Sequence, residues 1–591
     1  ATFHLWSAGV TPFTALVQRP VHLALLASLA FVGVGVRRNS GEPTRTGRAF
    51  AWVLGVGAVV SCLYLVTQHA ELVRRSGSPT PVDLVLGGVA VVVVLELARR
   101  TTGWGLVTVA GAALLYAVTG PLLPGVLAHR GYGPVRLIEH LYLSTEGIWG
   151  VPLGVSADFV YLFILFGALL DAAGGGALLI AHADRVAGRT RGGPAKTAAV
   201  ASAFMGSLSG SAVANVVTTG SFTIPLMRRA GFRPAFAGAI EAAASTGGQL
   251  MPPVMGAGAF ILATWTSIPY AEVAMAAAVP AALYYVALLM AIHFRAGRMG
   301  IEPGTGVGDD QGVLARLPLL LPLAVVVFYL ATGRSPMRAA FWGVTSAVAV
   351  GLLRRPRLDG AALRGAVEGA ASGAVQVAAA CAAAGIVVGV ASLTGIGLRL
   401  SGLIVTLSGG HLLPALGLTA LGSIVLGMGL PTTAAYVVLA ALGAPALVEL
   451  GVPLLAAHLF IFYFGCISNV TPPVSLAAYA AAGLSGAHPL TTALHAMVLA
   501  GAGFLVPFMF VYGPPLLLQG GVAEIALALT TATAGVTALA AAGMGWLRGP
   551  LSPWLRALLA AAALALIFPG LWTDGFGLAI LGLALLLPPS R

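Results

Sequence analysis

Two pairs of polar segments rich in glycine and proline interrupt the apolar sequence, and the second pair resembles the first. In the first pair, GSLSGSAVAN at residues 206–215 is followed by STGGQLMPPV at 245–254; in the second, GMGLPTTAAY at 427–436 is followed by CISNVTPPV at 466–474. Unwound backbone persists inside a bilayer only where it lines a cavity or binds an ion, because lipid cannot satisfy free N–H and C=O groups. Paired interruptions of this kind indicate the binding site of a secondary transporter built from two repeats.

The composition places the rest of the chain in a membrane. Of 591 residues, 58% are hydrophobic and 8% are charged, whereas a soluble surface needs roughly 25% charged residues. The net charge of +12 comes from arginines scattered between apolar runs; they form no basic face interleaved with aromatic side chains, so we expect no nucleic-acid partner. Cys62, Cys381 and Cys466 lie in apolar surroundings without metal-ligand spacing, and we expect them to be unpaired core thiols.

The apolar runs predict an all-α polytopic membrane protein. Each run is expected to form a helix, although several are shorter than the ~20 residues that cross a bilayer untilted. The expected spans are 21–36, 49–66, 84–98, 104–122, 152–171, 273–294, 317–331, 339–353, 371–393, 494–513, 523–546, 555–573 and 575–589. Between them lie the four interrupted segments 198–226, 235–264, 412–447 and 455–482.

The arginines predict an orientation, because cytoplasmic loops carry an excess of positive charge. Five groups can all be cytoplasmic at once, at residues 37–48, 99–100, 185–196, 228–233 and 354–357. This arrangement requires segment 198–226 to enter the membrane and return to the same side, as a re-entrant hairpin does. Arg74, Arg75 and Arg334 then fall outside, as exceptions to the rule.

Several strings resemble one transporter family. SGSAVANVVTTGSFTIPLM, ASTGGQLMPPVMGAGAF, RGGPAKTAAVASA and MGLPTTAAY resemble the large membrane subunit of tripartite ATP-independent periplasmic (TRAP) transporters. HRGYGPVRLIEHLYLSTEGIWGVPLGVSADFVYLF resembles the entry to the large-subunit part in the TAXI branch, whose small and large membrane subunits are fused in one chain. The resemblance extends over residues 104–515 and is weaker over 21–100.

The resemblance implies a fold, a partner and a division of the chain. The fold would be an elevator-type transporter with inverted repeats, each holding a re-entrant hairpin and a broken helix, supported by scaffold helices. A periplasmic substrate-binding protein would deliver the cargo. We divide the chain into an interfacial N-terminal segment (1–20), small-subunit-like scaffold helices (21–125), an external amphipathic connector (126–150), a first inverted repeat (151–300, hairpin 198–226), a cytoplasmic linker (301–316), scaffold helices (317–358), a second inverted repeat (359–515, hairpin 412–447) and additional C-terminal transmembrane helices (516–591).

The residues at the interruptions suit a sodium ion. A partly dehydrated Na⁺ needs hard oxygen ligands, which helix breaks supply as backbone carbonyls beside neutral hydroxyl and amide side chains. Prolines such as Pro252 and Pro473 free carbonyls by removing helix hydrogen bonds. The predicted Na⁺ ligands are Ser209, Gly210, Ser211, Asn215, Gly247, Gly429, Pro431, Thr432, Ser468, Asn469 and Pro472. The predicted substrate-binding residues are Ser211, Asn215, Thr246, Gln249, Thr432, Thr433, Asn469 and Thr471.

A structural explanation competes with this assignment. Small residues such as glycine, serine and threonine also let helices pack closely in membranes. Four such clusters at matching places in two repeats favour the binding interpretation, and the hairpin helices would present free N–H groups to an anionic substrate.

Few charged or titratable residues lie within the apolar segments. Glu241 is a candidate for a cation or proton site, since an intramembrane carboxylate is a functional candidate, or for an ion pair with Arg233. Arg399 either attracts a carboxylate or extends to the interface. His458 is expected to be a satisfied core histidine.

These observations and the resemblance together predict a Na⁺-coupled importer of small organic anions in a bacterial or archaeal cytoplasmic (inner) membrane; that the anions are carboxylates or amino-acid-like is implied by the resemblance. The chain contains no GxxxxGK[ST] loop, so an ion gradient is the expected energy source. Proton coupling, or uptake without a binding protein, is the alternative within transport. A remote alternative is an intramembrane aspartyl protease, on the GVGD string at residues 306–309. No oligomeric state is predicted, and a monomer is one option.

Overall fold

The protein is described by a computed structural model that covers residues 1–591 except 34–44, 76, 304–316, 354–357, 568–569 and 587–591. Within the described residues the secondary structure is helical, with two isolated β-bridges and no named strand. Eleven helices in these ranges are long and apolar enough to cross a membrane, so the predicted all-α polytopic fold is confirmed. The expected linker from residue 304 onward, and with it the GVGD string, lies outside the described residues.

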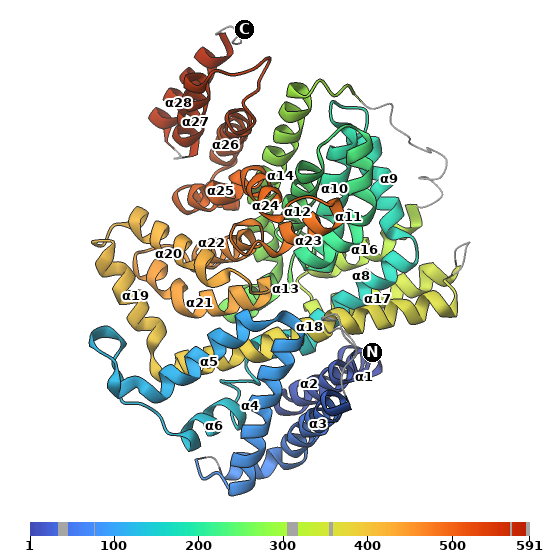
Figure 1. The fold of residues 1–591 in the computed structure, drawn as a ribbon, viewed down its shortest axis with the longest axis vertical. Helices are drawn as coiled ribbons and strands as arrows, with labels where there is room; N and C mark the ends of the chain where they lie inside the picture. Colours follow the sequence, from blue (N-terminus) through green and yellow to red (C-terminus); the bar gives the residue numbers. More distant parts are fainter. Residues whose placement is uncertain (34–44, 76, 304–316, 354–357, 568–569, 587–591) are drawn as a thin grey trace.

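The N-terminal part is a group of helices at the bottom of Figure 1. Helix α2 packs along α3, α3 along α4, and α4 along α5 and α6. The bounds are α1 (Thr2–Gly9), α2 (Ala15–Val32), α3 (Arg45–Arg74), α4 (Pro81–Thr102), α5 (Trp104–Thr119), the short 3-10 helices η1 (Gly120–Leu122) and η2 (Gly125–Leu127), and α6 (Pro134–Tyr142).

The connector predicted at 126–150 packs on this group and on α18 (Gly360–Thr394). Trp149 is fully buried, and its indole N–H donates to the Tyr142 carbonyl oxygen at 2.7 Å. The hydroxyl of Tyr142 in turn donates to the Ser61 carbonyl oxygen at 2.7 Å. Gly385 of α18 leaves no room for a side chain, since a Cβ there would lie 2.5 Å from the Gly147 carbonyl oxygen. The connector is therefore an integral part of the packing.

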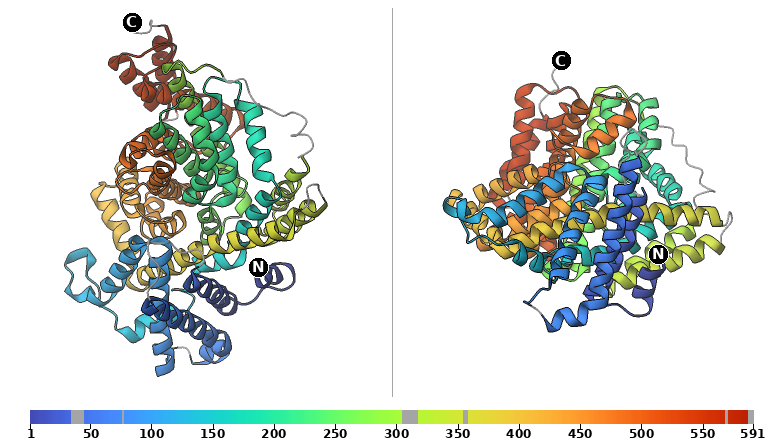
Figure 2. Two further views of the ribbon diagram at one scale, coloured as in Figure 1. Left: turned by 45° about the vertical axis from the view of Figure 1, so that its right-hand side comes forward. Right: turned by 60° about the horizontal axis from the view of Figure 1, so that its bottom comes forward.

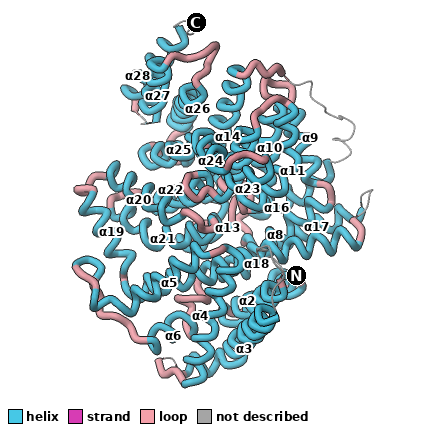
Figure 3. Tube along the Cα trace, in the orientation of Figure 1, coloured by secondary structure: helices cyan, strands magenta, loops and turns pink. Residues whose placement is uncertain are grey.

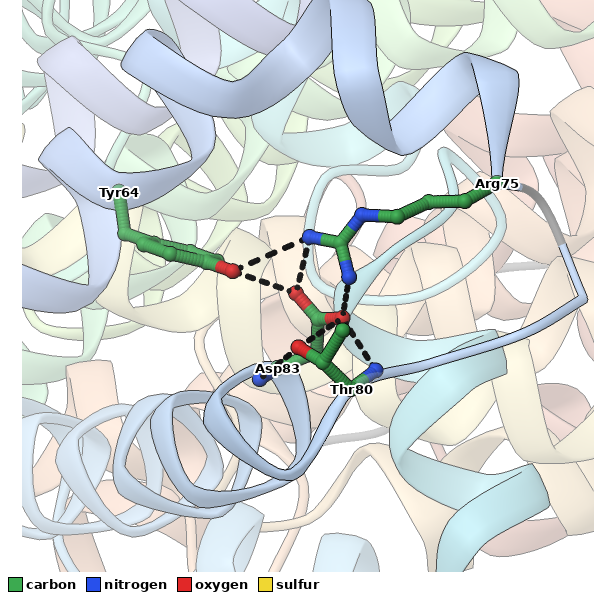
Figure 4. A network of polar contacts seen from close by, with 4 residues as sticks. All are labelled: Tyr64, Arg75, Thr80 and Asp83. Atoms are coloured by element: carbon green, nitrogen blue, oxygen red, sulfur yellow. Dashed lines mark hydrogen bonds and ion pairs between the residues drawn. The ribbon is translucent and has the colours of Figure 1, made fainter.

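The turn between α3 and α4 is held by one buried carboxylate (Figure 4). Asp83 accepts hydrogen bonds from the Tyr64 hydroxyl at 2.8 Å and from the Thr80 backbone N–H at 2.6 Å. Arg75 donates to both carboxylate oxygens of Asp83 and to the Tyr64 hydroxyl. The pairing gives Arg75 a structural partner, which explains why this arginine departs from the charge rule used to orient the chain.

A first set of helices leads from the connector to the undescribed linker. It comprises α7 (Val151–Val155), the π-helical turn η3 (Ser156–Val160), α8 (Tyr161–Ala172), α9 (Gly175–Ala187), α10 (Gly193–Ser209), α11 (Ala212–Arg229), α12 (Pro234–Gly248), α13 (Ala257–Thr266) and α14 (Tyr270–Arg298). A 3-10 turn η4 (Leu317–Leu320) and the paired helices α16 (Leu321–Ala331) and α17 (Pro336–Leu353) follow.

A second set repeats the same order of elements. It comprises α18, α19 (Ile396–Leu407), α20 (Leu412–Gly427), α21 (Thr432–Glu449), α22 (Leu454–Ile467), the 3-10 turn η5 (Ser468–Val470), α23 (Leu476–Ser485), α24 (Pro489–Leu499) and α25 (Gly501–Tyr512). The chain ends with the 3-10 turn η6 (Pro514–Leu517), α26 (Val522–Met544), α27 (Pro553–Ile567) and α28 (Leu571–Leu586), at the top of Figure 1. In both sets a helical pair is followed by a helix interrupted at its centre.

Helix α18 connects the N-terminal part to the rest of the molecule. It is the longest helix described, with 35 residues, and it runs across the middle of the views in Figures 1 and 2. It packs against α2, α4 and α5 on one side and against α8 and α21 on others. The sequence predicted only 371–393, whereas the helix begins at Gly360, and Asp359 caps it by accepting from the Ala362 N–H at 2.7 Å.

The two interrupted helices exchange partners between the sets. The pair α10 and α11 packs on α12, and α11 and α12 also pack against α23 from the second set. The pair α20 and α21 packs on α22, while α21 and α22 contact α13 from the first set. The second half of each interrupted helix therefore lies against the other set. Loops between these helices lie among packed helices near the centre of Figure 3.

The outer surface is apolar, as a lipid-facing surface is. Large hydrophobic side chains such as Leu122, Val522 and Trp572 are more than 80% exposed. A soluble monomer rarely exposes contiguous apolar area on this scale, whereas lipid tails solvate such side chains. The three cysteines are free and buried, as the sequence predicted.

We predict that Asp83→Ala destabilises the α3–α4 turn, because the Tyr64 hydroxyl, the Arg75 guanidinium and both the N–H and the hydroxyl of Thr80 lose their acceptor. A hydrogen bond to a charged group contributes about 1.5–3 kcal/mol, so the free energy of unfolding should fall by at least ~2 kcal/mol. Arg74→Ala is the control: Arg74 pairs with Glu71 at 2.7 Å, but the side chains are 75% and 55% exposed, and loss of an exposed pair costs less than ~1 kcal/mol. Thermal unfolding in detergent measures both, and equal shifts would contradict the structural role of Asp83.

Candidate binding site at the helix breaks

The first helical pair turns at Gly210. Helix α10 ends at Ser209, and Gly210 has φ +65°, a left-handed conformation that glycine adopts without strain. A Cβ at Gly210 would also lie 3.4 Å from the backbone nitrogen of Ala257. Ser211 then caps α11 by accepting from the Ala214 N–H at 3.3 Å. The turn is therefore tight and lies against the start of α13.

The second helical pair turns in the same way at Gly429, which has φ +77°. Pro431 precedes α21 with φ −60°, and no side chain caps that helix. At Gly105 in α5 a Cβ would lie 3.0 Å from the Gly429 carbonyl oxygen. This turn therefore touches the N-terminal helical group.

The two interrupted helices break at equivalent Pro-Pro sequences. After α12 the chain is irregular from Gln249 to Gly256, and after η5 it is irregular from Thr471 to Ser475. A tyrosine hydroxyl holds each irregular segment: Tyr270 donates to the Pro253 carbonyl oxygen at 3.0 Å, and Tyr479 donates to the Pro473 carbonyl oxygen. Both Pro-Pro bonds are cis.

A chain of hydrogen bonds joins all four breaks, and we call it the polar chain. The Gln249 amide N–H donates to the Gly210 carbonyl oxygen at 3.2 Å, and the Thr432 hydroxyl donates to Gln249 Oε1 at 2.8 Å. The Asn469 amide N–H donates to Thr432 Oγ1 at 3.1 Å and to the Cys466 carbonyl oxygen at 3.1 Å. Gln249, Thr432 and Asn469 are 0%, 8% and 4% exposed. The breaks of both sets therefore converge on one buried point.

The structure distributes the predicted site residues between three places. Gly210, Gln249, Thr432 and Asn469 form the polar chain. Residues beside it on the same turns and breaks are Ser209, Ser211, Thr246, Gly247, Gly429, Pro431, Thr433, Ser468, Thr471 and Pro472. Asn215 lies one turn into α11, where its amide N–H groups face Ser202 and Ser245.

Several side chains beside the breaks already have backbone partners. Ser468 donates to the Gly465 and Gly427 carbonyl oxygens at 2.8 and 3.2 Å, which ties broken helix α22 to hairpin helix α20. Thr471 donates to the Ile467 carbonyl oxygen at 2.9 Å. These contacts give Ser468 and Thr471 a structural task, and each oxygen keeps a lone pair for a further partner.

Other polar atoms near the breaks have no partner among the described residues. They are the Thr246 hydroxyl, the Ser475 hydroxyl and the Asn215 carbonyl oxygen, on side chains that are fully buried. A buried polar atom without a hydrogen bond costs free energy and calls for an explanation such as a bound ion or water. Thr246 was predicted from the sequence, whereas Ser475 was not.

Helix N-termini also point to this region. No side chain caps α13, α21 or α23, which begin at Ala257, Thr432 and Leu476 directly after the breaks. The first N–H groups of each helix are therefore available, and the helix dipole makes these ends attractive to anions. Three such ends at one site form an environment suited to a carboxylate.

Glycines that the sequence analysis did not assign bring the broken helices close to the hairpins. A Cβ at Gly206 would lie 2.9 Å from the Gly248 Cα, so α10 and α12 touch through their backbones. A Cβ at Gly427 would lie 2.9 Å from the Ser468 Oγ. The close-packing role proposed as the alternative for small residues therefore falls on Gly206, Gly248 and Gly427, and also on the predicted ligand Gly247, where a Cβ would lie 2.3 Å from the Tyr284 ring.

Two further candidates have structural partners. His458 Nδ1 lies 2.9 Å from the Tyr436 hydroxyl, as expected for a satisfied core histidine. Arg399 donates to the carbonyl oxygens of Val126 and Ala128 in the connector. A cavity of about 500 Å³ lies away from the breaks, where Tyr329, Arg338 and Trp342 form part of its lining.

Comparison with known proteins gives one family and three relatives. The family described as "Tripartite ATP-independent periplasmic transporter, DctM component" matches residues 89–525, which is more than half of the chain. The uncharacterized protein y4mL of Sinorhizobium fredii is 28% identical over 42% of this chain and 56% of its own. The "C4-dicarboxylate TRAP transporter large permease protein DctM" of Pseudomonas aeruginosa is 35% identical over 22% of this chain and 30% of its own. The uncharacterized protein YgiK of Salmonella typhimurium is 34% identical over 15% and 21%.

These matches are partial. The chain spans about half the length of y4mL and less than a third of the two other relatives. The family match begins at residue 89, so α1 to α3 lie outside it. It includes all four breaks and the polar chain.

We predict that Gln249 and Thr432 are energetically coupled. Gln249→Leu and Thr432→Val should each lower the free energy of unfolding by about 1–3 kcal/mol, because each leaves a buried polar group without its partner. The double variant should be less destabilised than the sum, with a coupling of about 0.5–1.5 kcal/mol. Thr433→Val is the control, since its hydroxyl is outside the polar chain. Thermal unfolding of the four proteins measures the coupling, and strict additivity of Gln249→Leu with Thr432→Val would contradict the bond.

Proposed function

Since the chain belongs to the DctM family of tripartite ATP-independent periplasmic (TRAP) transporters, we propose that it is a Na⁺-coupled importer of small organic anions. In this proposal a periplasmic substrate-binding protein delivers the anion. The protein is a multi-pass protein of the inner membrane. The family is one of transporters, and we assign no enzymatic reaction to the chain. The protease alternative rests on a string outside the described residues.

The observation that carries the proposal is the convergence of four helix breaks on the polar chain. Gln249 from the first set and Thr432 and Asn469 from the second bring neutral oxygens to one buried point. The uncapped N-termini of α13, α21 and α23 add hydrogen-bond donors and positive dipole ends. A carboxylate and a Na⁺ have complementary needs, because the first requires donors and the second requires oxygen ligands.

The carboxylate class follows from this chemistry and from one relative. The Pseudomonas protein is named for C4-dicarboxylates, and a carboxylate suits the N–H groups at the three helix ends. We therefore propose carboxylates or amino-acid-like anions as cargo. The unpartnered Thr246 and Ser475 hydroxyls are the side-chain groups that we expect the bound anion or its Na⁺ to engage.

The membrane potential and the sodium gradient supply the energy in this proposal. Each positive charge that moves inward down ~100 mV contributes ~2.3 kcal/mol. Two or more Na⁺ per anion therefore drive its accumulation against a gradient. We propose that the predicted ligands Ser209, Gly210, Ser211 and Asn215 on the first turn, with Gly247, Gly429, Pro431, Thr432, Ser468, Asn469 and Pro472, provide this coordination.

We also propose an elevator mechanism in a TAXI-type fused chain. The helical pairs and broken helices would move as one transport domain, because they interlock through α13 and α23. The N-terminal helices α2 to α5 would remain with α18 as the scaffold, in the position of a small membrane subunit. The contact between Gly105 and the Gly429 carbonyl would then be part of the sliding surface.

Reconstitution into liposomes tests the function. The full chain, supplied with candidate binding proteins loaded with radiolabelled succinate, glutamate or 2-oxoglutarate, should accumulate an anion when an inward Na⁺ gradient is imposed. Omission of the binding protein should reduce uptake to background. Uptake that persists without Na⁺ would reject sodium coupling, and uptake without any binding protein would reject the delivery step.

The polar chain gives the matched variant for this assay. Asn469→Ala should abolish Na⁺-dependent uptake while membrane insertion stays intact, because its amide supports Thr432 and lies where the ligand is proposed to bind. Asn215→Ala is expected to behave similarly. Failure of either variant to insert or fold would favour the packing explanation for these residues.

We predict that Gly105→Val slows uptake and that Gly111→Val does not. Both glycines lie in α5, but a Cβ at Gly105 would lie 3.0 Å from the Gly429 carbonyl oxygen, whereas at Gly111 nothing lies within 4 Å. Overpacking costs about 1–3 kcal/mol, which lowers the population of the observed arrangement by roughly five-fold to more than a hundred-fold. Initial uptake rates per inserted protein measure the difference, and equal rates would place the sliding surface elsewhere.

A further inference from the structure

Glu241 is a buried carboxylate that the proposed anion and sodium site does not use. It lies in α12 eight residues before Gln249, about 12 Å along the helix axis. The residue is 0% exposed. Its neighbours are the two arms of the first helical pair, α10 and α11, which pack on α12.

Four hydroxyl groups surround the Glu241 carboxylate. Its Oε1 accepts from Ser202 at 2.9 Å, from Ser245 at 3.2 Å and from Thr219. Its Oε2 accepts from Thr223 at 2.6 Å. All hydrogen-bond partners recorded for this carboxylate within the described ranges are therefore neutral hydroxyls, and the alternative of an ion pair with Arg233 does not describe this site.

Asn215 forms the border of the Glu241 cluster. Its amide N–H groups lie 2.7 Å from the Ser202 hydroxyl oxygen and 3.0 Å from the Ser245 hydroxyl oxygen. As acceptors from Asn215, both hydroxyls direct their own hydrogens toward Glu241. The side-chain oxygen of Asn215, Oδ1, is buried and has no partner among the described residues, so the cluster keeps one free acceptor.

Four of the other ionisable groups on the helices packed against α12 contact α12 itself. On α14, the Tyr284 and Tyr285 hydroxyls donate to the Ala243 and Ala244 carbonyl oxygens at 2.8 and 2.6 Å; Tyr285 also interacts electrostatically with Glu241. Arg295 of α14 and His495 of α24 lie against the Phe236 ring, nearer the start of α12. The remaining groups are Lys196 on α10, Arg228 and Arg229 on α11, Glu272, Tyr270, His293 and Arg298 on α14, His458, Tyr463 and Cys466 on α22, and Tyr479 on α23.

The cluster satisfies Glu241 in both of its protonation states. When the carboxylate is ionised, it accepts from four hydroxyls, which offset part of the cost of burying a charge. When Oε2 carries a proton, that O–H donates to Thr223 Oγ1 across the same 2.6 Å, and the Thr223 hydroxyl turns to the Thr219 carbonyl oxygen at 3.0 Å. Thr219 has a similar alternative in the Asn215 carbonyl oxygen of the backbone, at 2.7 Å.

The same distances disfavour a metal ion at this place. The oxygens around Glu241 are 2.6–3.2 Å apart in these pairs, which is the range of direct hydrogen bonds. A Na⁺ inserted among them would have to separate them, whereas a proton needs no additional space.

We propose that Glu241 binds a proton from the outer side and releases it to the inner side during each transport cycle. The inference rests on the proposed function and extends it: a proton moves inward together with Na⁺ and the anion. In each cycle one hydronium ion protonates the carboxylate and becomes water, and the reverse transfer occurs at the other side. An intramembrane carboxylate with this degree of burial is a functional candidate on general grounds.

The position of the cluster couples it to the binding site. Asn215 follows Ser211 by one turn on α11, and Ser245 precedes Gln249 by one turn on α12. A shift of either helix when the breaks bind their ligands changes how many hydroxyls reach Glu241. Loss of donors disfavours the ionised carboxylate, so the carboxyl takes up a proton in one state and releases it in the other.

Infrared difference spectroscopy of the full chain in lipid tests proton binding without any substrate. Acidification should produce carboxylic C=O stretching intensity from buried acids in the unaltered protein, and the component that Glu241 contributes should be missing in Glu241→Gln, whereas the buried Asp83 and Asp574 keep theirs. Glu272→Gln is the matched control, because Glu272 is exposed in the first turn of α14 and should leave the band in place. Thr223→Val, which removes one hydroxyl partner and keeps the carboxyl, should shift the pH at which the band appears.

Two results of this measurement would overturn the proposal. One is a Glu241→Gln spectrum with the same buried-acid intensity as the unaltered protein; the other is an unaltered protein that shows no buried-acid band over the accessible pH range. Displacement of the band by Na⁺ with no response to pH would also overturn it, in favour of a sodium site. Circular dichroism and size-exclusion profiles establish that each variant is folded before its spectrum is interpreted.

Transport in liposomes gives the second arm. With Na⁺ at the same concentration on both sides, a pH gradient, acidic outside, should drive uptake of radiolabelled succinate, glutamate or 2-oxoglutarate from its binding protein. The pH-driven uptake is divided by the exchange of labelled for unlabelled anion measured without a gradient. In Glu241→Gln this ratio should fall to background, and in Glu272→Gln it should not. A Glu241→Gln ratio equal to that of the unaltered protein would overturn the proposal. If no gradient drives transport of any anion, the proposed function fails, while the infrared band still decides whether Glu241 binds a proton.

Discussion

The hydrogen bond between Gln249 and Thr432 joins two halves of the chain that are 183 residues apart in sequence. Its importance follows from its surroundings, because hydrocarbon offers no partner to a polar group and each helix break exposes several. Gln249 accepts from Thr432 and donates to the Gly210 carbonyl, so one amide serves three breaks. The turns at Gly210 and Gly429 and the Pro-Pro segments can exist among buried helices because such contacts satisfy part of their hydrogen bonding.

The Glu241 cluster also has to provide partners for a buried polar group, but it does so with side chains of the protein. At the breaks, backbone groups are left available and are suited to ligands that bring their own oxygens or charge. Around Glu241, side-chain hydroxyls are arranged so that one carboxyl is satisfied with or without a proton. The two places share α11 and α12, and Asn215 and Ser245 stand between them. The proposed coupling of anion, sodium and proton therefore needs no long pathway, only a small shift of two adjacent helices.

The sequence predicted the elements of this site better than their contacts. Glycine and proline have local effects on the backbone, so the breaks near Gly210, Pro252, Pro431 and Pro472 could be located from residue type alone. The partner of Gln249 could not, because a bond between distant residues depends on how the two sets pack. Asn215 was grouped with the breaks by proximity in sequence, whereas the helical rotation of α11 directs its amide to Ser202. Nothing in the local sequence indicated that the Tyr270 and Tyr479 hydroxyls hold the breaks. Tyr270 lies at the start of α14, and Tyr479 lies within α23.

The crossed packing of α13 and α23 has a consequence for biosynthesis. When the ribosome has completed the first set, α13 has not yet met α21 or α22, and α11 and α12 have not yet met α23. Neither set can complete its packing alone, so the first set stays in the membrane with its α23-, α21- and α22-binding surfaces uncovered until the second set has been synthesised. A gene split in the linker would encode two polypeptides that have to be produced together, each acting as the folding template of the other.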